Sequence, residues 1–174
     1  MIDISTNVNT IISQLNQYKA NLQSKNKLML ERLAQIGINI AQVKFGSAQY
    51  DGYNDVSVPG TPQWISDTTL QISAEGNAVT FIEFGTGVFY PSRHPMEAEL
   101  GFIRGEYGEG KGSNDSWGYY GDPGTNGRVI KKKSGQTVVI THGNPPARAM
   151  YDAAKVMRSK IVDIAREVYG FNDR

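Results

Sequence analysis

The side chains best suited to acid–base or metal chemistry are the two histidines of the chain, His94 and His142. A histidine beside carboxylates can hold a divalent metal or transfer protons, and Glu97, Glu99 and Asp152 are the acids that could complete such a group. The spacing matches no ligand motif, and the histidines do not form a helical pair. A hydrolase acting through either histidine therefore stands as a hypothesis against the structural roles that we favour, a turn residue and a backbone contact before a helix.

A second chemical candidate is the glycine-rich turn Gly85-Thr86-Gly87. Such turns after strands can cradle phosphate when a helix begins there or when a lysine with Ser or Thr follows. Neither feature is expected here, so we interpret the glycines as residues that let the backbone turn sharply. We expect no catalytic residue, cofactor or metal.

A basic run, Lys131 to Lys133 with Arg128 nearby, could contact nucleic-acid phosphate. Three lysines at a hairpin tip equally suit a solvated edge that discourages strand addition.

Trp117, Tyr119 and Tyr120, in a glycine-rich segment, could stack on bases or sugars. We favour a protein interface, where aromatic residues supply contact area at low entropic cost.

The composition sets limits on function. The chain has 174 residues, of which 39% are hydrophobic, enough for one domain with an ordinary core. Its 18 basic and 17 acidic residues leave a net charge of +1, which provides no global field for nucleic acid or an anionic membrane. The absence of cysteine excludes disulfides, and we expect no membrane segment or signal peptide and synthesis in the cytoplasm.

Apolar residues at three- and four-residue steps predict a long helix over 6–45. Its first half is polar around a thin apolar stripe, so we expect a projecting arm that could bury this stripe on a neighbouring subunit. The segment 145–169 predicts a second helix, opened by Asn144 and two prolines and ended by Gly170.

Between these helices the pattern is that of strands. Val79 to Phe84 alternates and predicts a central strand, paired in a hairpin over 64–87. A loop over 88–127 carries nine of the chain's 19 glycines, with one short strand expected near Ser116 to Tyr120, and a second hairpin is expected over 128–141. The prediction is a single α+β domain over 1–174, with two long helices packed on an antiparallel sheet.

Four motifs in this order resemble one protein family. They are Ile82-Glu83-Phe84-Gly85-Thr86-Gly87, His94-Pro95, Trp117-Gly118-Tyr119-Tyr120, and the run from Thr141 through Pro145-Pro146-Ala147-Arg148 to Tyr151. Together they resemble the tail-completion or head-tail joining proteins of long-tailed bacteriophages and prophages. The doubled proline before Ala147, and Ala149 itself, depart from the family pattern.

The resemblance implies a structural virion protein without catalytic activity. It implies a ring of identical copies, a hexamer, at the neck between the head connector and the tail. The implied partners are other copies, connector or adaptor proteins, and tail-tube or tail-terminator proteins, with passive DNA contact in the channel and none with a membrane. We expect its interface to use five aromatic residues: Phe89, Tyr107, Trp117, Tyr119 and Tyr120.

Overall fold

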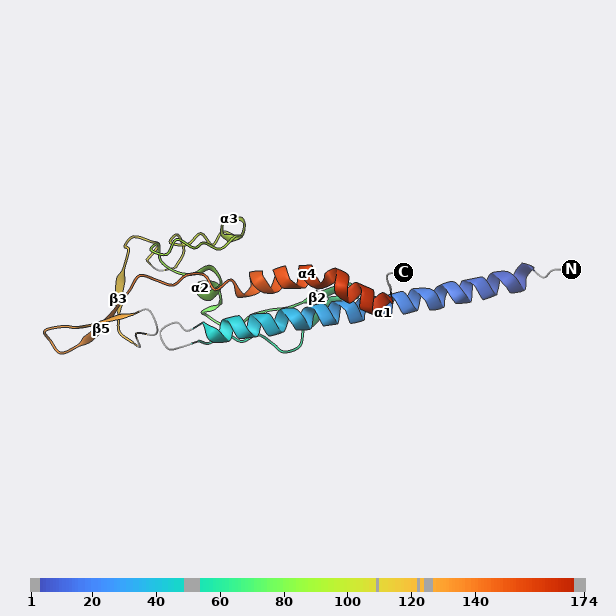
Figure 1. Cartoon of the computed structure of the whole chain (residues 1–174), viewed down its shortest axis with the longest axis horizontal. Helices are drawn as coiled ribbons and strands as arrows, with labels where there is room; N and C mark the ends of the chain where they lie inside the picture. Colours follow the sequence, from blue (N-terminus) through green and yellow to red (C-terminus); the bar gives the residue numbers. More distant parts are fainter. Residues whose placement is uncertain (1–3, 49–53, 109, 122, 124–126, 171–174) are drawn as a thin grey trace.

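The computed structural model describes residues 4–48, 54–108, 110–121, 123 and 127–170. It is an α+β structure in which two long helices lie side by side, with small antiparallel sheets beside and beyond them (Figure 1). In chain order the elements are α1 (Ile4–Ser47), β1 (Gln63–Ser66), β2 (Thr69–Gln71), α2 (Val79–Phe84), α3 (Glu97–Leu100), β3 (Trp117–Tyr119), β4 (Arg128–Lys131), β5 (Thr137–Thr141) and α4 (Ala149–Tyr169).

Helix α1 is one uninterrupted helix of 44 residues, which corresponds to about 66 Å of axial length. The predicted helix over 6–45 therefore extends slightly further at both ends. Its second half lies against α4, whereas its first half projects beyond the other elements (Figure 1). The long stretch without proline explains the continuity, and the tertiary contacts explain which half is covered.

The main core lies where α1 meets α4. Ile38, Ala41 and Phe45 from α1 are buried against Ala149 and Ala153 of α4. The small alanines let the two backbones approach each other. At Gly37 the approach is so close that a Cβ would lie 2.6 Å from the sulfur of Met157.

Helix α4 begins at Ala149 rather than at Pro145. The residues before it are held in an extended path, because the amides of Ala147 and Arg148 donate to the carbonyls of Ile82 and Glu83 at 2.8 and 3.2 Å. Arg148 has a left-handed backbone, with φ of 55°, and the helix follows directly. Its end at Gly170, with φ of 73°, agrees with the predicted stop.

The predicted central strand at Val79 is wrong, because Val79–Phe84 forms the short helix α2. Three consecutive residues, Ile82, Glu83 and Phe84, are buried. In a strand, neighbours point to opposite faces, so all three would be covered only by packing on both sides. The helix instead places Ile82 in the main core, with Glu83 directed at α4.

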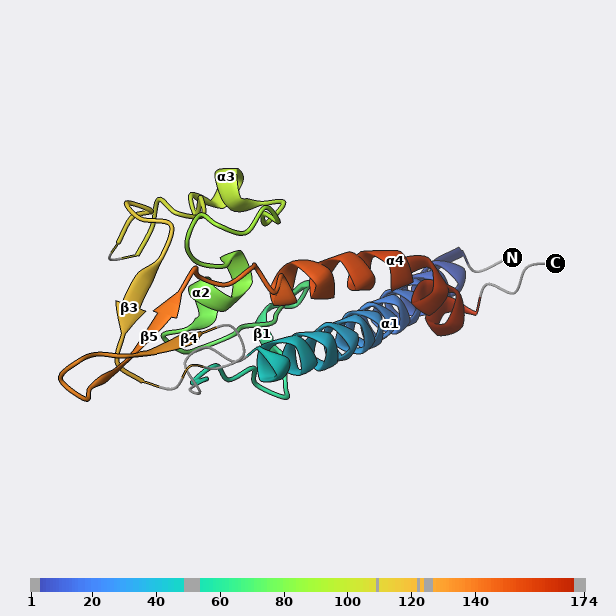
Figure 2. The same ribbon diagram turned by 60° about the vertical axis from the view of Figure 1, so that its left-hand side comes forward.

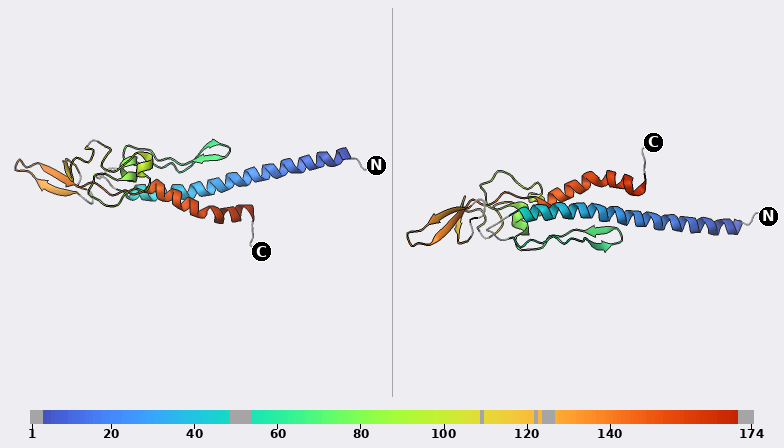
Figure 3. Two further views of the ribbon diagram at one scale, coloured as in Figure 1. Left: turned by 90° about the horizontal axis from the view of Figure 1, so that it is seen from above. Right: turned by 60° about the horizontal axis from the view of Figure 1, so that its bottom comes forward.

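The predicted hairpin over 64–87 is consequently wrong as well. The hairpin consists of β1 and β2, with Gln63 opposite Gln71 and Trp64 opposite Leu70. The turn between these strands is supported by the hydroxyl of Ser66, which accepts a hydrogen bond from the amide of Thr68 at 3.2 Å. Figure 3 shows that this hairpin runs alongside α1, on a different side of that helix from α4.

The remaining strands form a sheet in the order β3-β5-β4. Strands β4 and β5 are the hairpin predicted over 128–141, and β3 is the short strand predicted near Ser116 to Tyr120. The central strand of this sheet is β5, whose Val138 and Val139 are buried. The sheet lies at the end of the molecule away from the free end of α1 (Figure 2).

Candidate functional site

The buried carboxylate of Glu83 connects several distant segments of the chain. It accepts hydrogen bonds from the amides of Met150 and Tyr151, at 2.8 and 3.0 Å, in the first turn of α4. Such amides lack partners inside their own helix. Because Arg148 at the N-cap makes no side-chain capping bond within the described residues, Glu83 caps α4 from a distant part of the chain, where a negative charge is favourable.

His94 is the third partner of this carboxylate. Its Nε2 lies 3.0 Å from Glu83 Oε1, and its Nδ1 lies 3.1 Å from the amide of Met96. Because the amide can only donate, Nδ1 must accept, and the neutral tautomer with hydrogen on Nε2 satisfies both contacts. The buried ring also packs on Phe84 and Tyr151, at centroid distances of 4.5 and 5.3 Å.

The glycine turn joins the two longest of the four motifs. Thr86 and Asn144 exchange backbone hydrogen bonds of 2.8 and 3.2 Å. Gly85 has φ of 80°, and a Cβ there would lie 2.7 Å from both Asn144 O and Pro146 N. The glycine is therefore required by close backbone approach as well as by its conformation, in agreement with a structural interpretation of this turn.

The side chains of the other predicted chemical residues have other partners, although the amide of Glu97 donates to the His94 carbonyl at 3.2 Å. His142 is exposed, with Nδ1 3.1 Å from the carbonyl of Asp115. Glu97 is buried near Arg93, whereas Asp152 pairs with Lys44 of α1. Among the described residues, no group of three or more His, Asp and Glu side chains could hold a metal ion.

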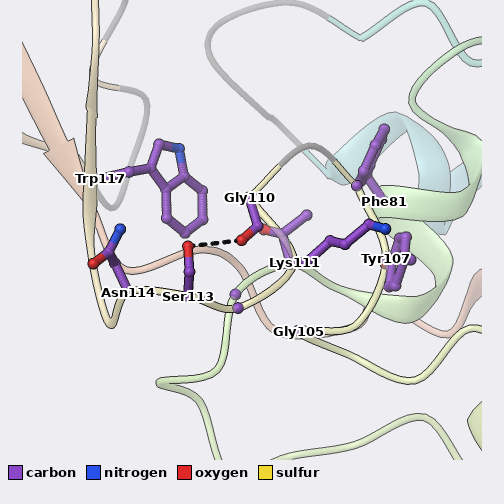
Figure 4. A pocket seen from close by; sticks show the side chains of 12 residues that line it. Phe81, Gly105, Tyr107, Gly110, Lys111, Ser113, Asn114 and Trp117 are labelled. Atoms are coloured by element: carbon purple, nitrogen blue, oxygen red, sulfur yellow. Dashed lines mark hydrogen bonds between the residues drawn. The ribbon is translucent and has the colours of Figure 1, made fainter.

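A pocket of about 440 Å³ lies where the glycine-rich loop meets α2 and β3. Phe81, Tyr107 and Trp117 supply its aromatic walls (Figure 4). Tyr107 stacks on Phe81 at a centroid distance of 5.7 Å and donates its hydroxyl hydrogen to the Gly85 carbonyl. The pocket could accept an apolar or aromatic group, and Phe81 is a lining residue that the strand interpretation missed.

The environment of Tyr107 also changes its acidity. Burial raises the pKa of Tyr107 to about 12, since the phenolate form would lose solvation. Arg104 opposes this shift and Glu97 adds to it. At neutral pH the hydroxyl therefore remains a hydrogen-bond donor to the turn at Gly85.

The five predicted interface aromatics differ in accessibility. The hydroxyl of Tyr107 is hydrogen-bonded within the chain, and Tyr119 is half-buried. Phe89, Trp117 and Tyr120 are exposed. Phe89 packs on His142, the residue that follows β5. Trp117 pairs with Thr141 at the end of the same strand, so Phe89 and Trp117 lie near each other at one edge of the sheet.

The basic tip of the β4–β5 hairpin is exposed, and one of its lysines already has a neighbour. Lys132 Nζ lies 3.1 Å from the Tyr120 hydroxyl and 5.4 Å from the centre of its ring. The tip thus combines positive charge with an aromatic face.

An uncovered apolar feature lies on the projecting half of α1. Val8, Ile11, Ile12, Leu15 and Tyr18 form what we call the arm stripe, and 61% of Leu15 and 64% of Tyr18 are exposed. Their spacing places them on one side of the helix. Isolated exposed apolar residues are common, whereas a continuous set of this kind marks an interaction surface.

No protein-family model matches the chain, and neither curated proteins nor solved structures gave a significant match. Over the described residues, no helix carries a stretch long and apolar enough to cross a bilayer.

Proposed function

We propose that this chain is a structural subunit that assembles with copies of itself into a ring at the neck of a long-tailed bacteriophage. The observation that carries the proposal is the arm stripe. About half or more of each of its side chains is exposed, on a helix that extends away from the body. Covering this stripe on another subunit would remove apolar surface from water, the main driving force of association.

The arrangement at Glu83 also supports a structural role. The three hydrogen bonds of its carboxylate connect α2 to the start of α4 and to His94 in the loop after α2. A general base needs a free lone pair directed at a substrate. Here the carboxylate and His94 are buried and engaged with each other and with backbone amides.

The assignment to the phage neck rests on the resemblance of the four motifs. Two of them, at Ile82 to Gly87 and at Thr141 to Tyr151, are joined by hydrogen bonds in the fold, which gives their joint occurrence a physical reason. A ring subunit needs two different surfaces that meet when copies are related by a fixed rotation. The exposed arm provides one such surface, and the exposed aromatics Phe89, Trp117 and Tyr120, which lie in another part of the chain, are available for further contacts with neighbours.

The test is the mass of the purified protein in solution, by light scattering over a range of concentrations, followed by imaging of phage particles with an antibody to this chain. A closed ring of defined mass and label at the neck are expected. A monomer at every concentration together with unlabelled necks would overturn the proposal.

A nucleic-acid-binding module is the second candidate, favoured by the exposed tip where Lys132 lies over Tyr120. Phosphate contacts make DNA affinity fall steeply with salt. Strong, salt-dependent DNA binding by the isolated protein, lost when Lys131, Lys132 and Lys133 are changed to Gln, would favour this alternative over the ring.

A further inference from the structure

A second uncovered apolar surface lies on the body of the chain, between α1, β2 and α4. This body groove has a volume of about 410 Å³. Its apolar lining includes Leu30, Leu33, Leu70, Ile72, Met157 and Ile161. Arg158 is the one charged residue among its described lining residues. Leucine and methionine side chains give such a groove an adaptable apolar surface.

The arm stripe and the body groove match in chemistry and length. Val8 to Tyr18 covers about 15 Å of helix, and the α4 side of the groove, from Met150 to Ile161, covers about 16 Å. The stripe itself is aliphatic apart from Tyr18. A helix with one apolar side fits a groove that is apolar along its floor.

The arm cannot fill the groove of its own chain. Leu15 of the stripe and Leu30 of the groove belong to the same continuous helix α1, which holds them about 22 Å apart along its axis. The groove can therefore receive only the arm of another copy.

Two other ways of covering the stripe have less support. Arm-to-arm pairing as a coiled coil needs at least three heptads, whereas the apolar repeat from Val8 to Leu22 covers about two and then reaches Lys25. A two-fold pair, each arm in the other's groove, would use up both arms and both grooves in a dimer, and it could not extend into the proposed ring.

We infer that the arm stripe of one copy docks in the body groove of the next copy, head to tail. This inference rests on the proposed function and specifies its subunit contact. Each copy donates one arm and receives one arm, so the same contact is repeated from copy to copy. The copies form a closed ring if a whole number of the rotations that relate neighbouring copies makes one full turn.

The absence of cysteine in the sequence allows a direct test. Leu15→Cys and Ile161→Cys place one thiol on the arm and one in the groove, both at exposed positions that leave the core intact. After mild oxidation the double variant is expected to give a ladder of disulfide-linked multimers on a non-reducing gel, which a reductant collapses. Each single variant is expected to remain monomeric on that gel.

The matched control replaces Ile161→Cys by Val162→Cys, an exposed neighbour on α4 that does not line the groove. This pair is expected to give at least tenfold less multimer. Dimers from Leu15→Cys alone would indicate arm-to-arm pairing, and a double variant that stops at dimers would indicate a two-fold pair. Either result, or no crosslinking by a folded double variant, overturns the inference.

These outcomes can be separated from the failure of the proposed function. If the antibody labels particle necks but the double variant gives no crosslinking ladder, the neck assignment stands and the contact between arm stripe and body groove is rejected. A ladder from a chain that is absent from particle necks would retain the contact and reject the neck assignment.

Discussion

The carboxylate of Glu83 accepts a hydrogen bond from the backbone amide of Met150, 67 residues later in the chain, at 2.8 Å. This contact fastens α2 to the start of α4 and places a negative charge where the amides of α4 are unpaired. His94 completes the arrangement from the loop between them.

Replacing Glu83 should therefore weaken the whole fold. Glu83→Ala removes an acceptor shared by two helix amides and a buried imidazole, and we expect the free energy of unfolding to fall by about 3 kcal/mol. Urea denaturation followed by circular dichroism measures this change. The control is Glu99→Ala, because Glu99 is exposed on α3. A loss equal to that of the control would show that Glu83 does not cap α4.

Gly85 should tolerate alanine much less than Gly101 does. Both have positive φ, 80° and 73°, so Ala costs each about 1 kcal/mol in backbone strain. Only at Gly85 does the new Cβ meet backbone atoms, whereas at Gly101 it meets nothing within 4 Å among the described residues. We expect Gly85→Ala to cost about 3 kcal/mol in all. Equal melting temperatures for the two variants would contradict the close approach of residues 85 and 144.

Low pH should loosen the start of α2. The amides of Asn77 and Ala78 donate to the Asp55 carboxylate at 2.7 and 3.0 Å and lower its pKa below the ordinary value of 3.8. Because the pKa of Asp55 is lower in the folded protein than in the unfolded chain, this stabilisation is complete above the unfolded-chain pKa of about 3.9. It is lost as the pH falls through the folded-state pKa. We expect the NMR shift of the Asn77 amide to titrate below that pH. In Asp55→Asn the titration should be absent, and a titration that persists would assign it to another group.

High pH should act through Tyr107. Its pKa is raised to about 12, so its contribution to stability is complete below about pH 10, the unfolded value, and is lost as pH rises from there through 12. Tyr107→Phe removes this dependence together with the hydroxyl's bonds to the Thr80 and Gly85 carbonyls. Unfolding free energies at pH 8 and pH 11 are expected to differ less in the variant than in the parent protein. A Tyr120→Phe protein, altered at an exposed tyrosine, is the control.

Polar substitution of the arm should separate assembly from folding. Ile11→Gln with Leu15→Gln removes apolar side chains that are more than half exposed in the single chain, so thermal unfolding of the monomer should shift little. Light scattering should show loss of the oligomer, because its apolar contact is gone. Gln17→Ala with Asn21→Ala, outside the arm stripe, should leave assembly intact. An oligomer that survives the first pair would exclude the arm stripe as the contact.

Several features of this protein follow from its sequence by local physics. The three- and four-residue spacing of apolar residues predicts α1 and α4, because that spacing forms one helical side. Gly170 stops α4 since it can adopt a left-handed conformation. The β-branched run at Thr137 to Thr141 predicts the strand that becomes the centre of the three-stranded sheet. The polar first half of α1 also predicts the projecting arm.

The conformation of Val79–Phe84 and the network around Glu83 were decided by tertiary structure. Alternating β-favouring residues describe a strand when only their neighbours in sequence are considered. Packing selects the helix, because it buries Ile82 against Phe45 and Ala149 while it directs Glu83 to the amides of α4. Glu83, His94 and Met150 share no sequence period, so their contact depends on how the chain folds back on itself. Burial and hydrogen bonding between distant segments here outweigh a local β preference of about 1 kcal/mol or less per residue.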